Sequence, residues 1–255
     1  MSDQDRSSAL AEAFGSGILD SIQEFWFQHL ADETHIVVPS TEDMKVWFMD
    51  KSDEFDSFCR DKYGNILTII KTSSSTPEEI LAAANPTTSL NWMSLIILLD
   101  QLPRNIYRGT SASIISHTFD PLALAIALKA RAQYIHLDPS IRYRLSYRLW
   151  VFMPFEHAED LEMQEIMVRE QRARWYDMQD HLLNNKVTTQ DSEITKYCRS
   201  VVISKQEELE TCTGLLKKAV DEHYEAIKRF GRFPYRNKTL GRETTREEQE
   251  FLDAM

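Results

Sequence analysis

Residues 90–102 read LNWMSLIILLDQL, which places apolar side chains around almost the whole circumference of a helix. A helix with this pattern is buried on most of its sides. Pro103 follows at once and ends the pattern. The stretch therefore predicts a central, buried helix, and with it an all-α fold.

The segments on both sides of this stretch carry helical signals of their own. Thr76 and Pro77 form a strong helix start, and Ser52 and Asp50 are alternative caps for another helix. Residues 34–40 are expected to form a loop or a short extended piece that Pro39 ends, and residues 184–193 are expected to form a loop. The total of about nine or ten helices, with no convincing strand, favours an array of antiparallel helical hairpins. The expected helices cover residues 18–30, 46–64, 75–84, 90–102, 122–135, the stretch from Pro139 to Pro154, 161–183, one or two helices over 193–229, and a capped turn starting at Thr245.

Composition limits the class of protein. The chain has 255 residues, of which 42% are hydrophobic, and we expect a mobile tail over residues 1–16 and a single all-helical domain over 17–255. A net charge of -11 argues against non-specific binding to nucleic acid. Three cysteines without CxxC spacing, no leader peptide and no long apolar run predict a cytoplasmic protein without a membrane span.

The segment DQLPRNIYRG (100–109) combines acidic, amide and basic side chains just after the apolar helix. Arginine suits this position in a binding site because its fork matches the two oxygens of a carboxylate or phosphate. The alternative is that these side chains pair with one another and brace the helix end. The substrate-binding candidates are Asp100, Gln101, Arg104, Asn105 and Arg108.

The segment FMPFEHAED (152–160) contains a histidine among carboxylates. An imidazole changes charge near neutral pH, so His157 is the leading candidate for a general acid or base, helped by Glu156 or Glu159. Two alternatives remain. The acidic residues cap the next helix, or they hold a divalent metal with His157, although the paired histidines of a zinc protease are absent.

The segment RFGRFPYRN (229–237) interleaves arginines with aromatic residues. Gly231 and Pro234 make it a shaped loop at the end of a helix. His223 lies about two turns earlier and is a second acid–base candidate. The alternative is that the arginines tie this loop to acidic helices. Trp47, beside Asp50, is a candidate for a cleft wall. The candidates of this loop are Arg229, Arg232, Arg236 and Asn237.

Three strings occur in the order LLDQLPRNIYRGT, PFEHAED and H-x6-FGRFPYRN, and together they resemble the bacterial and fungal family called domain of unknown function 924. The resemblance covers residues 18–252 and implies an all-α fold similar to tetratricopeptide repeats, but no secure activity. The chain departs from the family pattern beside the candidate site, where the family usually has Phe, Met, Ser and His. The residues at those positions here are Leu102, Glu156, Ala158 and Tyr235.

Two functions fit these segments. The first is an enzyme without metal or cofactor that acts on a small anionic or carbonyl-bearing molecule, with His157 moving a proton and arginines holding the anion. The second is a helical-repeat binding protein whose arginines grip an acidic peptide. Beneath both lies the alternative that the charges form an internal ion-pair network. Of partners, a small anionic molecule and a second copy of the chain are expected.

Overall fold

The structure is a computed structural model, which describes residues 3–49, 52–184 and 191–254. Helices dominate it, and these residues form no strand. The all-α class is confirmed, with more helices than the sequence predicted, whereas the tetratricopeptide-like arrangement stays a prediction. In chain order the α-helices are α1 (Asp3–Phe14), α2 (Ile18–Phe27), α3 (Glu33–Val37), α4 (Thr41–Phe48), α5 (Asp53–Ser73), α6 (Pro77–Ala84), α7 (Ser89–Asp100), α8 (Leu102–Ile106), α9 (Asp120–Ala132), α10 (Leu145–Glu156), α11 (Leu161–Tyr176), α12 (Glu193–Ser204), α13 (Gln206–Phe230) and α14 (Arg246–Asp253).

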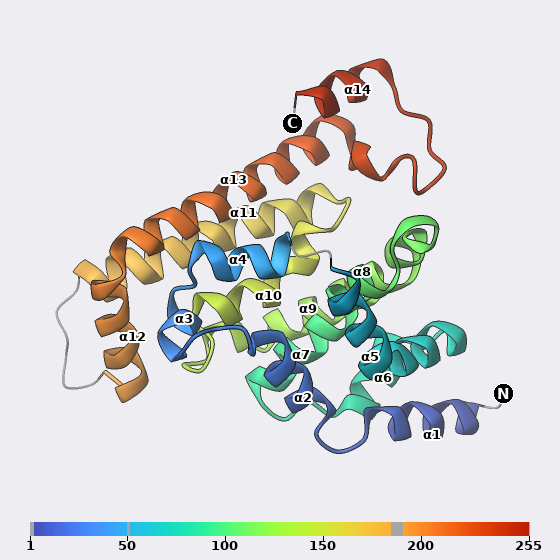
Figure 1. Cartoon of the computed structure of the whole chain (residues 1–255), viewed down its shortest axis with the longest axis horizontal. Helices are drawn as coiled ribbons and strands as arrows, with labels where there is room; N and C mark the ends of the chain where they lie inside the picture. The colour runs from blue at the N-terminus through green and yellow to red at the C-terminus, as the bar shows by residue number, and fades with distance from the viewer. Residues whose placement is uncertain (1–2, 50–51, 185–190, 255) are drawn as a thin grey trace.

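Helices α7 and α10 lie at the centre of the molecule, side by side (Figure 1). Every residue of α10 is buried, and α7 is buried from Trp92 to Asp100. This is the outcome that the apolar circumference of residues 90–102 predicted. Pro154 lies inside α10, which continues to Glu156. The end of the most buried helix therefore carries Glu156, and His157 follows as its cap.

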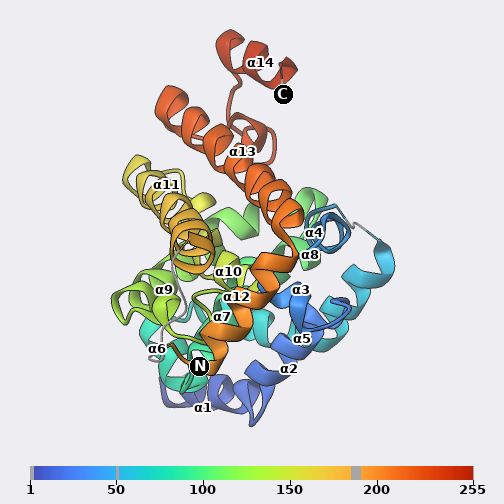
Figure 2. The same cartoon turned by 90° about the vertical axis from the view of Figure 1, so that its left-hand side faces the viewer.

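Helices α11 and α13 form a long antiparallel pair along one side of the molecule, and α14 lies beyond the end of α13 (Figures 1 and 2). Buried ion pairs join α10 to this layer. Arg148 donates to Glu170 at 2.6 Å and to Asp177 at 2.5 Å. Gly231 ends α13 in the left-handed conformation, with a φ of 67°, as its position predicted.

Helix starts with strong caps were predicted well. Ser52 accepts from the backbone of Phe55, so it caps α5, and Asp50 lies outside the described residues. Thr76 with Glu79 forms a capping box at α6, and Thr245 with Glu248 forms another at α14. None of the described helices is long and apolar enough to cross a membrane.

Several local predictions differ from the structure. Residues 34–40 were expected to be a loop or a short extended piece, but α3 begins at Glu33 because Asp32 caps it. The chain restarts as α8 with Pro103 in its first turn, where the ring is tolerated. Residues 1–16 were expected to be a mobile tail, whereas α1 buries Leu10 and Phe14 against the core. Two apolar residues four apart give that helix a buried stripe.

Candidate functional site

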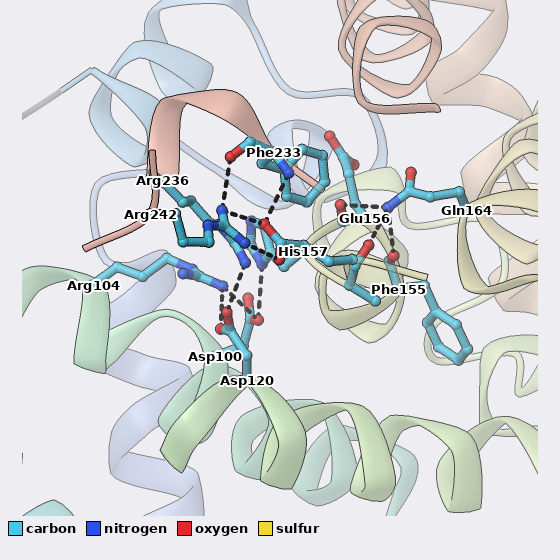
Figure 3. A network of polar contacts seen from close by, with 12 residues as sticks. Asp100, Arg104, Asp120, Phe155, Glu156, His157, Gln164, Phe233, Arg236 and Arg242 are labelled. Atoms are coloured by element: carbon cyan, nitrogen blue, oxygen red, sulfur yellow. Dashed lines mark hydrogen bonds and ion pairs between the residues drawn. The ribbon is translucent and has the colours of Figure 1, made fainter. Parts of the chain in front are cut away.

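Asp100 is the centre of a polar cluster where the ends of α7 and α10 meet (Figure 3). Its side chain is fully buried, with 0% of its surface exposed. It accepts from Gln101 Nε2 at 2.5 Å and from Arg104 Nη2 at 3.3 Å. A buried carboxylate with several donors is held in one orientation.

His157 is oriented by that carboxylate. Its Nδ1 lies 2.9 Å from Asp100 Oδ1, and because a carboxylate only accepts, Nδ1 donates. Burial would raise the pKa of Asp100, but the charges of His157 and Arg104 outweigh it and hold that pKa well below its usual range. Among the described residues nothing hydrogen-bonds His157 Nε2. Its side chain keeps 17% of its surface exposed.

Gln164 fixes the chain around His157 from the other side (Figure 3). This buried side chain on α11 directs its Nε2 to the carbonyls of Phe155, Glu156 and Ala158, at 3.1, 2.9 and 2.9 Å. The last carbonyls of an α-helix have no partner within the helix, so an amide donor there satisfies groups that are otherwise costly to bury. The backbone of the site is thus tied to α11.

Asp120, at the start of α9, compensates the arginines of the cluster. Arg104 Nη2 lies 2.7 Å from Asp120 Oδ1, and Arg236 Nη1 lies 3.3 Å from Oδ2. Arg104 also contacts Asp100, so two carboxylates face two guanidinium groups. The pKa of Arg104 is raised, since these carboxylates outweigh its burial. Arg104 and Arg236, which were expected to hold an anion, are therefore already paired with carboxylates of the protein.

Two cavities meet at His157, which lines both. The first has a volume of about 570 Å³ and several charged side chains on its wall, and it is called the polar cavity. The second has a volume of about 500 Å³ and a mostly apolar wall formed by α4, α10 and α13. Charged and titratable residues of the polar cavity include Asp120, His157, Glu159, Asp160, Arg236 and Arg242. Apolar residues of the second cavity include Met44, Phe48, Met153, Leu215, Leu216 and Ala219.

The apolar cavity contains a second carboxylate–imidazole pair. Glu156 is buried on α10, and its Oε1 lies 3.3 Å from His223 Nδ1 on α13. The same Nδ1 donates to the carbonyl of Ala219 at 2.8 Å. Both histidines of this cavity therefore turn Nδ1 to an acceptor of the protein, and in each the remaining ring nitrogen is Nε2. The structure thus brings together three of the four predicted acid–base candidates.

Glu159, the fourth acid–base candidate, is committed to the loop after α13. It accepts from Arg242 at 2.7 and 3.0 Å and from the backbone of Phe233 at 2.8 Å. Burial raises its pKa, but these donors outweigh that effect and lower it. Glu159 lines the polar cavity as part of an ion pair.

Three predicted binding residues of the C-terminal loop lie away from both cavities. Arg232 forms a two-pronged contact with Glu248 at 2.6 and 3.0 Å, and Arg229 pairs with Glu247 at 2.7 Å. Asn237 is fully buried and donates to Glu248 at 3.2 Å. These residues fasten α14 to the end of α13, which is the bracing alternative for this segment.

Three further predicted binding residues, Arg108, Asn105 and Trp47, also contact other side chains or the backbone of the protein. Arg108 pairs with Asp56 on α5, at 2.8 Å for its Nη2, and also donates to Asn105 at 3.1 Å. Trp47 donates from Nε1 to the carbonyl of Trp26 at 3.0 Å and packs edge-on against Trp150 in the core. Its neighbour Phe48 lines the apolar cavity instead.

Comparison with known proteins adds a family and no activity. The model of the family described as "Bacterial protein of unknown function (DUF924)" matches residues 22–255. The chain belongs to the DUF924 family. This DUF924 chain is 26% identical to a solved protein of unknown function from Agrobacterium tumefaciens, with a TM-score of 0.55. The match covers 94% of this chain and 99% of that one. No curated protein matches.

Sequence reasoning missed Asp120, Arg242 and Gln164 in this DUF924 protein. Asp120 precedes Pro121, so a helix start explained it fully. Arg242 lies in a polar stretch without local periodicity, and Gln164 looks like any polar residue of an amphipathic helix. Only long-range contacts reveal their roles. Within the described ranges, no three His, Cys, Asp or Glu side chains are grouped to hold a metal ion.

Proposed function

We propose that the protein is an enzyme that moves a proton on a small anionic or carbonyl-bearing molecule, with His157 as the general acid or base. One observation carries this proposal. A fully buried Asp100 lies 2.9 Å from His157 Nδ1, and His157 lines two cavities with Nε2 unpartnered among the described residues. Asp100 is the positioning residue, because its negative charge stabilises the imidazolium that forms when Nε2 takes up a proton.

The scale of the cavities supports a small-molecule substrate. Ligand pockets commonly measure about 300–1,000 Å³, and both cavities fall within that range, at about 570 and 500 Å³. A binding protein for acidic peptides receives less support. Its arginines would need free charge, whereas Arg104 and Arg236 face Asp120, and Arg232 faces Glu248.

The test compares three purified proteins in a small-metabolite extract, followed by mass spectrometry. The wild type should deplete at least one metabolite, and His157→Ala should slow that depletion by about 10²- to 10⁴-fold. The matched control is His35→Ala, because His35 also pairs with an aspartate, Asp43, at 2.6 Å, yet lines neither cavity. A wild-type metabolite profile equal to that of His157→Ala would contradict the proposal, as would a loss confined to His35→Ala.

A further inference from the structure

The cavity between α4, α10 and α13 has a wall suited to an uncharged ligand with an apolar body. Met44, Met153 and Leu216 are buried or nearly so in its interior, and Phe48 and Leu215 keep 43% and 48% of their surface exposed. Two exposed large apolar side chains at one cavity are a feature of binding sites. The methionines adapt their shape to a ligand more readily than branched residues do.

Charge in this cavity is already balanced by the protein. Glu156 faces His223, and the buried Arg174 guanidinium lies close enough to Glu156 to interact with its charge. Lys45, the cationic residue that lines the cavity, pairs with Glu42 at 2.9 Å. None of the described residues that line this cavity is an arginine, so an anionic ligand would be buried there without direct contact with a guanidinium group, which is costly.

Two imidazoles share this apolar cavity, and they come from different elements. His157 follows α10 and is held by Asp100, while His223 lies on α13 and is held by Glu156 and the Ala219 carbonyl. Each directs Nδ1 to the protein, so Nε2 is the nitrogen that can serve a ligand. A neutral imidazole accepts a proton at Nε2, and a protonated one donates from it. At Nε2, His157 and His223 can thus each act as a base when neutral and as an acid when protonated.

We propose that this cavity binds a small uncharged ketone or aldehyde with an apolar body, and that His157 and His223 enolise it as base and acid. The proposal rests on the proposed function, since it assigns the substrate class and the second proton-transfer group of that site. It selects the carbonyl-bearing substrate over the anionic one, and the apolar cavity over the polar one.

The step conserves atoms and electrons without a co-reactant. Nε2 of neutral His157 takes a proton from the carbon beside the carbonyl, and the electron pair of that C–H bond forms a C=C bond. The carbonyl π pair takes the Nε2 proton of protonated His223. The products are an enol, a protonated His157 stabilised by Asp100, and a neutral His223. Return of a proton to carbon completes an exchange or an isomerisation.

Binding is tested with prodan, an uncharged naphthyl ketone whose emission shifts to the blue in apolar surroundings. The wild type should bind it saturably. Ala219→Phe places a ring in the apolar cavity and should weaken binding about tenfold or more, since the wall contacts are lost. The matched control is Leu240→Phe, which fills the polar cavity instead and should leave binding unchanged. Leu215→Glu, at an exposed position, repeats the test without any demand on core packing.

Competition then separates ligand charge from ligand shape. Acetylnaphthalene, an uncharged ketone, should displace prodan, whereas naphthoate, an anion of similar shape, should do so about tenfold less well. Equal binding of prodan by the wild type and Ala219→Phe, or loss of binding in Leu240→Phe alone, would overturn the assignment to this cavity. Stronger displacement by naphthoate would overturn the uncharged substrate class.

Chemistry is tested by hydrogen–deuterium exchange of the acetylnaphthalene methyl group in D₂O, followed by NMR. The wild type should accelerate exchange, and both His157→Ala and His223→Ala should lose most of that acceleration while still binding prodan. Exchange at the wild-type rate in His223→Ala overturns the role of His223 alone. The proposed function has its own test, independent of ketone binding. It fails if His157→Ala keeps full turnover of the metabolite found in the extract.

Discussion

Two aspartate–histidine pairs of this protein have similar chemistry and different surroundings. His35 lies 2.6 Å from Asp43 with 21% of its side chain exposed, and His157 lies 2.9 Å from Asp100 with 17% exposed. Asp43 also accepts from Ser40 in the capping box of α4, so the first pair closes a helix start. The second pair stands at two cavities. The carboxylate–imidazole contact therefore does not distinguish the two pairs, whereas the adjoining cavities do.

The largest expected effect is a difference in turnover between a variant of the Asp100–His157 pair and the matching variant of the Asp43–His35 pair. Asp100→Asn keeps the shape of the side chain but removes the charge that stabilises protonated His157, so turnover should fall about 10³-fold. Asp43→Asn makes the same change in the other pair and should leave turnover close to that of the wild type. Both are measured with the metabolite that the wild type depletes. Equal losses in the two variants would mean that the pairs do not differ in function.

A smaller effect is expected on the free energy of unfolding, when the hydrogen bonds that support each pair are removed. Gln164→Leu removes the amide that donates to three buried carbonyls at the end of α10, of which that of Phe155 keeps the Ala158 N–H at 3.3 Å. This loss should lower the free energy of unfolding by about 2 kcal/mol. Ser40→Ala removes the cap beside Asp43 and should cost about 1 kcal/mol. Denaturant unfolding measures both. A Gln164→Leu protein as stable as the wild type would show that water replaces the amide.

The smallest expected effect is on thermal stability at low pH. Burial alone would raise the pKa of Asp43, but the hydrogen bonds from His35 and Ser40 outweigh it and lower that pKa. A lowered pKa in the folded state stabilises the protein above the unfolded value of about 3.8, and this contribution is lost as the pH falls below it. The melting temperature of Asp43→Asn should therefore drop less than that of the wild type between pH 5 and 3. A steeper drop in Asp43→Asn would reverse the sign.

The parts of the fold that were predicted depend on local chemistry. The apolar circumference of residues 90–102 gave α7, and the caps at Thr76 and Thr245 gave two helix starts. The short helix α3 was missed, because it follows from one aspartate cap and has little hydrophobic pattern of its own.

Only part of the candidate site was predicted, for a different physical reason. Asp100, His157 and His223 were singled out because their functional groups can be recognised from the residue type alone. In the structure Asp100 contacts His157, and both histidines line the apolar cavity. Arg232 has the same chemistry as Arg236, but its partner Glu248 lies on α14, while that of Arg236 lies on α9. Ion pairs between distant segments leave no periodic pattern, so the two arginines looked equivalent.

The division of the apolar cavity between helices has a consequence for how the protein can diverge. Its floor comes from α10, which is buried throughout and carries the Glu156–His157 end. Its rim comes from α4 and α13, where Phe48 and Leu215 are half exposed. Substitutions at the rim change what enters without disturbing the core, whereas those at the floor threaten folding. Under the proposed function, substitutions at Phe48 or Leu215 would change substrate preference at little cost in stability.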